Sequence, residues 1–290
     1  MRVRGLVSLA VLFVLFNSFE LRAAGPAGIL PFTLTGTGQI LVPVTVNGSG
    51  PHLFVLDTGA NRSAISDALA ARLALAPVAT TEMVTSSGSA IAGVVRLRTV
   101  SLGAHHASDV LAPLVPAVRV QAVHARAEGI IGQDVLIDAH YTLDYRRARV
   151  LWLDPDTGSG PGTRLTLRRS EGRLLVGLPQ SSRQDDIAWF VPDSGASTLV
   201  LFQNGGRAAV SATPLGATVQ VATVTGDDQV QAAIVPKLRI GAGTLWDQPA
   251  VLAAGPGGGG SGVHRVDGLL PLAGFAAVTF NGPEHYMVVK

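Results

Sequence analysis

The chain has 290 residues, of which 47% are hydrophobic and only 14% charged. It can therefore bury a large core as one or two domains and is not expected to be disordered. The formal charge is only +2 and the basic residues form no long stripe, so we expect no nucleic-acid partner. The absence of cysteine excludes disulfides, thiolate catalysis and cysteine-bound metal.

The first residues follow the order of a secretory signal. Arg2 and Arg4 precede an apolar run, Leu6–Phe16, and a polar stretch and two alanines come next. The run is too short to cross a bilayer comfortably. We therefore expect residues 1–24 to be a signal peptide, the mature protein to be periplasmic or secreted, and no stable membrane insertion after signal removal. Leu21 makes the cleavage motif imperfect, so an uncleaved anchor is the alternative.

The mature chain begins with strand patterns. Ile40–Val46 and His52–Leu56 are apolar runs on either side of the turn sequence Asn47–Gly50, which predicts a hairpin. Ala64–Leu75 has apolar residues at helical spacing, and Pro77 would end that helix.

Further strand-like segments follow, and a polar segment divides the chain. These strand-like segments are Glu82–Thr85, Ile91–Leu102, Val118–Val123 and Tyr141–Leu153. Asp154–Gly162 is rich in Asp, Gly, Ser and Pro, which indicates a boundary. We expect two lobes, 25–154 and 163–290, with 155–162 as linker. Gly255–Gly262 is a loop by composition, and we expect the core or the lobe interface to hold Trp152, Trp189 and Trp246.

An internal repeat is the most informative feature. Phe54–Ala60 (FVLDTGA) returns as Phe190–Ala196 (FVPDSGA). At a similar distance after each copy comes a glycine-plus-aliphatic segment, Gly129–Gly132 in the first half and Gly268–Pro271 in the second. Two copies predict two similar units related by an approximate two-fold axis.

The repeated segment suits acid–base chemistry. An apolar strand that ends in Asp places a carboxyl group at a buried strand end, and glycine allows a sharp turn and close approach there. If the two units meet about a two-fold axis, Asp57 and Asp193 come together. Two carboxyl groups in contact cannot both ionise, so they share one proton. The ionised member can activate a water, and the protonated member can polarise a peptide carbonyl.

These segments resemble retropepsin-like aspartic peptidases. Asp57–Ala60 and Gly129–Asp134 are similar to the active-site turn and the later glycine-bearing segment of that family, and the second half repeats the pattern in the manner of two-lobed, pepsin-like enzymes. The resemblance implies a mostly β, two-lobed acid-protease-like barrel fold with pseudo-two-fold symmetry and one or two short helices per lobe. It also implies an aspartic endopeptidase with peptide or protein substrates and no cofactor or metal.

The resemblance assigns site residues as well. It makes Asp57 and Asp193 the catalytic pair. The residues that support the pair would be Thr58, Gly59, Ala60, Ser194, Gly195 and Ala196. The family also has hairpin flaps over its cleft. The flap candidates are Thr81–Val94 and Val219–Ala233, with turns at Ser86, Ser87, Gly88 and Ser89 and at Thr225 and Gly226.

Two departures weaken the second half. Pro192 replaces Leu56 directly before the aspartate, and proline resists a central strand. Pro271 stands where the first half has Gly132. The first half therefore fits the family pattern better than the second, and the catalytic role of Asp193 has less support from the sequence than that of Asp57.

Several alternatives stay open. A single Asp-Ser/Thr-Gly triplet is a weak signal, and we interpret Asp156–Gly158 as linker because no apolar run precedes it. The fold could also hold an extended peptide without cutting it, or Gly25–Gly36 could keep a zymogen closed. We expect a monomer, and a homodimer that pairs Asp57 with its own copy is the alternative.

Overall fold

The computed structural model describes residues 28–85, 88–154, 157–181, 186–203, 210–222, 226–255 and 266–290. The proposed signal peptide lies outside these ranges. Most of the described residues belong to β-strands, with a few short helices. The mostly β fold expected from the sequence is therefore confirmed.

The first sheet contains 8 strands from the first half of the chain. Their spatial order is β2 (Thr33–Leu34), β3 (Ile40–Val46), β4 (Ser49–Leu56), β9 (Gly129–Ile131), β5 (Ala64–Ser66), β8 (His105–Val115), β7 (Gly88–Leu102) and β6 (Pro77–Thr85). A pairing of two residues of β7 with β3 curls this sheet back on itself. So short a contact leaves a curled sheet rather than the closed barrel that the resemblance implied.

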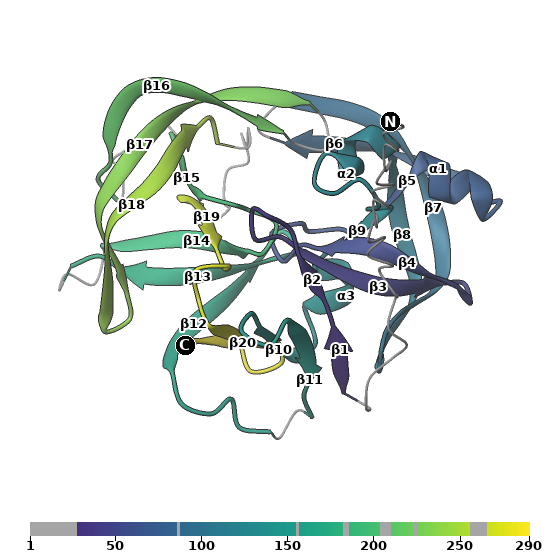
Figure 1. Cartoon of the computed structure of the whole chain (residues 1–290), viewed down its shortest axis with the longest axis horizontal. Coiled ribbons are helices and arrows are strands. Elements are labelled where there is room, and N and C mark those ends of the chain that lie inside the picture. Colours follow the sequence, from purple (N-terminus) through teal and green to yellow (C-terminus); the bar gives the residue numbers. More distant parts are fainter. Residues whose placement is uncertain are drawn as a thin grey trace, which may run out of the picture.

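The second sheet contains 13 strands and draws on both halves. Its order is β1 (Ile29–Pro31), β11 (Arg149–Trp152), β10 (His140–Asp144), β20 (Ala277–Asn281), β21 (Tyr286–Val289), β12 (Thr163–Ser170), β13 (Arg173–Pro179), β14 (Ile187–Asp193), β19 (Gly268–Pro271), β15 (Leu199–Phe202), β18 (Gly243–Ala253), β17 (Asp227–Ile240) and β16 (Thr213–Ala222). In Figure 1 the first half fills most of the right side and the hairpins β16–β18 arch over the left.

The two repeated segments have the same strand pairing. Strand β4 runs parallel to β9, with Phe54 opposite Gly129. Strand β14 runs parallel to β19, with Phe190 opposite Gly268. Both phenylalanines are fully buried, and a Cβ on either glycine would lie within about 3 Å of the facing ring. The glycines are therefore needed so that a large aromatic ring can pack over each strand.

The helices differ from the sequence expectation. Within the described residues they are α1 (Asp67–Arg72), α2 (Ala117–Gln121) and α3 (Gln133–Leu136), all in the first half. The first half therefore has three helices instead of the one or two expected per lobe, and the described part of 163–290 contains none. Residues 204–209, soon after the second Asp-Ser-Gly turn, lie outside the described ranges.

Four local expectations need correction. The helix expected over 64–75 begins as strand β5 and becomes helical only from Asp67 to Arg72. The segment 118–123, expected as a strand, lies mostly in helix α2. The segment 141–153 is a hairpin, β10 and β11, instead of one strand. Trp246, expected inside, is 62% exposed and stacks under Lys237.

No helix in the described ranges is long and apolar enough to span a membrane.

The segment between the two proposed lobes gives a first prediction. Its described residues are exposed at Asp154, Thr157 and Gly158 and again from Gly160 to Gly162. We expect limited proteolysis, followed by mass spectrometry, to cut first within 154–162 or within the glycine-rich segment 255–262, most of which lies outside the described residues. Proteases cut exposed loop segments with small and polar residues most easily. Phe54–Leu56 is the internal reference, since it lies in a buried strand. Early cleavage there would contradict this division of the chain.

Candidate active site

The two Asp-Thr/Ser-Gly turns meet at the ends of strands β4 and β14. The Asp57 and Asp193 carboxyl groups lie close enough for each to act on the pKa of the other. A Cβ placed on Gly59 would lie 2.4 Å from the Asp193 carboxyl carbon. A Cβ on Gly195 would lie 2.8 Å from that of Asp57. Each glycine thus leaves the space that the aspartate of the other turn fills.

Backbone groups hold each carboxylate in the same way. Asp57 Oδ1 accepts the N–H groups of Gly59 at 2.9 Å and Ala60 at 3.1 Å. In the second turn, Asp193 Oδ1 accepts two N–H groups at 2.7 and 2.9 Å, from Gly195 and Ala196. The glycine and alanine of each turn therefore fix the orientation of their aspartate.

The hydroxyl residues of the two turns bind each other's strand. The Thr58 hydroxyl donates to the Pro192 carbonyl at 2.7 Å and accepts the Ser194 N–H at 3.0 Å. The Ser194 hydroxyl donates to the Leu56 carbonyl at 2.7 Å and accepts the Thr58 N–H at 3.0 Å. Both side chains are buried. These four bonds join the two halves directly beneath the carboxyl pair.

The surroundings raise the pKa values of both carboxyl groups. Burial raises the pKa of Asp193 well above its usual value, and the neighbouring Asp57 charge raises it further. Burial also raises the pKa of Asp57, but hydrogen bonds from Gly59, Asp193 and Ala60 and the Arg173 charge oppose that rise. One proton shared between the two groups is the arrangement that these effects favour.

Pro192 fits its strand for a local reason. Pairing between β13 and β14 ends at the Val176–Phe190 pair, so no β13 residue is paired opposite Pro192. Pro192 is paired only with Leu270 of β19, and its carbonyl accepts the bond from Thr58. The missing N–H of proline therefore breaks no paired ladder on the β13 side.

Gln133 and Asp134, which follow strand β9, brace the first turn from below. The buried Gln133 amide donates to the Thr58 carbonyl at 2.7 Å. Asp134 accepts the N–H and the hydroxyl of Ser63 at 2.8 and 2.6 Å. Asp138 is instead paired with Arg169 at the surface, so Asp134 and Asp138 do not act as an acid pair.

The flap candidates are only partly described. Both segments are hairpins, β6–β7 and β16–β17. Ser86, Ser87 and Thr225 lie outside the described residues. Gly88 begins β7 opposite Thr85, and the exposed Ser89 follows it. Gly226 directly precedes β17.

The second hairpin contacts the first half near these turns. The Arg119 guanidinium of α2 binds the Asp227 carboxylate of β17 at 2.6 Å. The end of hairpin β16–β17 is thereby tied to a helix of the first half.

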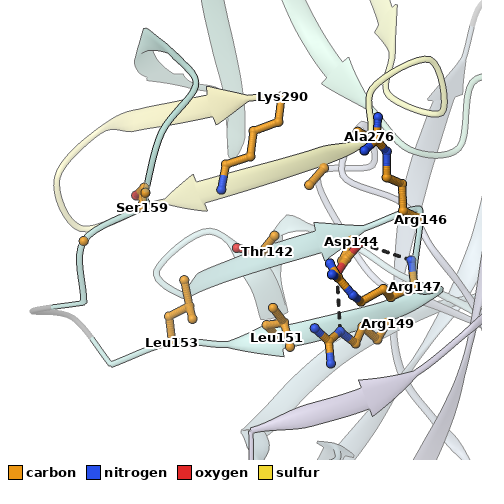
Figure 2. Close-up of a pocket in the computed structure, with 13 residues that line it drawn as sticks. Thr142, Asp144, Arg146, Arg147, Arg149, Leu151, Leu153, Ser159, Ala276 and Lys290 are labelled. Atoms are coloured by element: carbon orange, nitrogen blue, oxygen red, sulfur yellow. Dashed lines mark hydrogen bonds and ion pairs between the residues drawn. The ribbon is translucent and has the colours of Figure 1, made fainter.

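A separate hollow of about 400 Å³ lies away from the carboxyl pair (Figure 2). Thr142 and Asp144 of β10 line it, together with Arg146, Arg147 and Lys290. Alternate residues of β10 face opposite sides of the sheet, so Tyr141 and Leu143 point into the core instead. Within the described ranges, no group of three His, Cys, Asp or Glu side chains is placed to hold a metal ion.

Two neighbours of the pair were not anticipated from the sequence. Arg173 donates through Nε to the Gly59 carbonyl at 3.2 Å. Tyr145 is buried beyond the end of β10, and the Asp193 charge acts on its hydroxyl. Neither belongs to the repeat, so no motif marked them.

Comparison with known proteins agrees with the motifs. Residues 42–135 match the family model described as Aspartyl protease. The matched segment contains the Asp57 turn and the Gly129–Asp134 segment and ends before Asp193. It confirms the resemblance to retropepsin-like aspartic peptidases over this part of the chain. No curated protein matches the chain.

Proposed function

We propose that the protein is an aspartic endopeptidase whose catalytic pair is Asp57 and Asp193. The observation that carries the proposal is the meeting of the two turns, in which each carboxyl group lies against the glycine of the other turn and accepts two backbone N–H groups of its own turn. The aspartyl protease match over 42–135 supports peptidase activity in general.

The proposed reaction needs only the pair and a water molecule. The ionised carboxylate takes a proton from the water, and the water oxygen bonds to the scissile carbonyl carbon. The protonated carboxyl gives its proton to the carbonyl oxygen. Collapse of the tetrahedral intermediate breaks the C–N bond, and the proton taken from water passes to the leaving nitrogen. No covalent intermediate forms.

The proposal extends to architecture and location. Residues 25–154 and 163–290 would be two lobes related by a pseudo-two-fold axis, joined by 155–162, with the substrate in a cleft between them. The shared registers of the two repeats support this symmetry. The Arg-rich, apolar start of the chain supports export to the periplasm or outside the cell, and a monomer suffices because one chain supplies both aspartates.

The test is a peptide-library cleavage assay from acidic to neutral pH, with Asp57→Asn as the matched control. We expect cleavage by the native protein that peaks at acidic or mildly acidic pH and falls on both sides, because one carboxyl must be ionised and the other protonated. Asp57→Asn should lose this activity and keep its fold. Peptide binding without cleavage at any pH would instead favour a non-catalytic binding protein.

A further inference from the structure

Hairpin β12–β13 brings an arginine to the first aspartate turn. Its two turn residues, Glu171 and Gly172, have φ of 49° and 73°, as tight hairpin turns require. A Cβ on Gly172 would lie 3.7 Å from the Asn61 Cβ, so the tip of the hairpin lies against the segment after Asp57. Arg173 is the first residue beyond this turn and is half-buried.

Arg173 acts on Asp57 in two ways. Its Nε–H donates to the Gly59 carbonyl at 3.2 Å, and the Gly59 N–H donates to Asp57 Oδ1 at 2.9 Å. The guanidinium therefore helps to hold the turn whose N–H groups orient the carboxylate. It also stays positively charged at any working pH, and its charge opposes the effect of burial on the pKa of Asp57.

The second aspartate has no such partner at the corresponding place. In each half, the phenylalanine of the repeat is paired with a valine, Val42 on β3 and Val176 on β13. Three residues before these valines stand Gln39 and Arg173 respectively. Gln39 is neutral, and its side-chain oxygen accepts hydroxyl groups of its own turn. The repeat thus places a cation beside Asp57 and none at the matching position for Asp193.

Among the described residues, the other titratable neighbour of the pair carries no charge. Tyr145 is 8% exposed, and its hydroxyl has no hydrogen-bond partner within the described residues. Burial and the Asp193 charge both raise the pKa of Tyr145, so the phenol is neutral at working pH. The turn that begins with Tyr145 is held by Asp144, which binds Arg147 and Arg149 (Figure 2). The charge that acts on Asp193 is that of Asp57 itself.

We propose that Arg173 is a positioning residue that makes Asp57 the ionised member of the pair and Asp193 the protonated member. The inference rests on the proposed peptidase function and assigns the two roles within it. Asp57 accepts the proton of the attacking water and passes it to the leaving nitrogen. Asp193 gives its proton to the carbonyl oxygen and recovers one when the carbonyl forms again.

The test compares kcat/KM against pH for the native protein, Arg173→Gln, Arg173→Lys and Arg98→Gln. Loss of the positive charge makes ionisation of Asp57 harder, so the acid limb for Arg173→Gln should move to higher pH. We expect a shift of roughly 0.5–1 pH unit, at or below the lower end of the range of about 1–3 units for a close opposite charge, because Arg173 is only half-buried and solvent screens its charge. Arg173→Lys keeps a positive charge, so its acid limb should lie close to that of the native protein. Arg98 is exposed on β7, and its variant should leave the profile unchanged.

A uniform fall in kcat/KM for Arg173→Gln, with the acid limb unmoved, would overturn the inference and leave Arg173 with a structural role only. A second measurement does not depend on turnover. In protein with ¹³C-labelled aspartate carboxyl groups, resonances assigned with Asp57→Asn and Asp193→Asn should show Asp57 ionising first in native protein. The difference between the two apparent pKa values should become smaller in Arg173→Gln. Absence of cleavage with this titration intact would refute the peptidase proposal alone, whereas Asp193 ionising first would refute the role of Arg173.

Discussion

Asp193→Asn should lower kcat/KM by about 10³-fold or more, because proton transfer by a positioned group contributes about 10²–10⁴-fold and the pair acts as one unit. The substitution keeps the shape of the side chain, and the amide oxygen can still accept the Gly195 and Ala196 N–H groups. The measurement is single-substrate kinetics on the best peptide from the library. This variant is the sharper test of the pair, because Asp193 lies outside the matched segment 42–135.

The same variant should be more stable than the native protein at neutral pH. The pKa of Asp193 in the folded state lies above its value in the unfolded state. At pH values between these two pKa values, the folded state therefore binds more protons than the unfolded state. Native stability therefore falls as pH rises from about 4 through the raised pKa. Asparagine does not titrate, so the variant should gain a few degrees in Tm at pH 7, where about 1 kcal/mol corresponds to roughly 2–4 °C. At pH 3 the advantage should vanish.

Two results would contradict the shared-proton pair. Full activity in Asp193→Asn would mean that the reaction does not need Asp193. Either Asp57 would then pair with its own copy in a homodimer, or the reaction would be a different one. A Tm below the native value at pH 7, with the Tm at pH 3 unchanged, would contradict the raised pKa of Asp193 that the shared proton requires. Asp138→Asn is a suitable control, because that aspartate is exposed and paired only with Arg169.

The contact between the two aspartates could be anticipated because it follows from a repeat. Phe54 and Phe190 begin the same pattern, and each is paired with the first glycine of its downstream segment. Two parallel pairings of this kind place both aspartates at equivalent strand ends. The repeat also explains why Thr58 and Ser194 exchange bonds of matching lengths. A symmetric pattern in the sequence thus carries long-range information that local propensity does not.

Local pattern failed where tertiary pairing decided the conformation. Ile65 and Leu69 are both buried and four residues apart, which is helical spacing, but Ile65 is paired with Gly129 and Leu114 in the sheet. Ser66 then accepts the Leu69 N–H and starts helix α1. In the opposite sense, the valines of 118–123 suggested a strand, yet Val118 is exposed and Val120 buried on a short helix.

Arg173 could not be identified from sequence for a different reason. It is the first residue of strand β13, directly before three buried residues, and its partner is a backbone carbonyl 114 positions away. Only the closure of the two-residue turn at Glu171–Gly172 directs it toward Gly59. Arg173 contacts one of the two repeated turns and has no counterpart at the other, so the repeated motif itself cannot reveal it.

The second large effect should come from the bonds beneath the pair. Thr58→Val keeps the shape of a fully buried side chain but removes its hydroxyl, which leaves the Pro192 carbonyl and the Ser194 N–H without a partner. Each buried group left unsatisfied costs about 1–3 kcal/mol. We expect a loss of about 2–4 kcal/mol in the free energy of unfolding, or roughly 5–15 °C in Tm, measured by thermal unfolding.

Controls separate this network from ordinary burial. Thr58→Ser restores the hydroxyl and should recover most of the stability. Thr142→Val removes another buried hydroxyl, one that bonds Thr279 at 2.7 Å, and should lower Tm without changing kcat/KM. Thr58→Val should lower both, because the same bonds set the position of the carboxyl pair.

The partner residue provides the decisive measurement. Ser194→Ala removes the hydroxyl that bonds Leu56 and Thr58. Because both side chains belong to one network, the losses in the Thr58→Val, Ser194→Ala double variant should be smaller than the sum of the single losses, by about 0.5–3 kcal/mol. Strictly additive losses would mean that the two turns are stabilised independently. In that case the two halves would be held together by the sheet strands alone, and the carboxyl pair would not depend on the bonds beneath it.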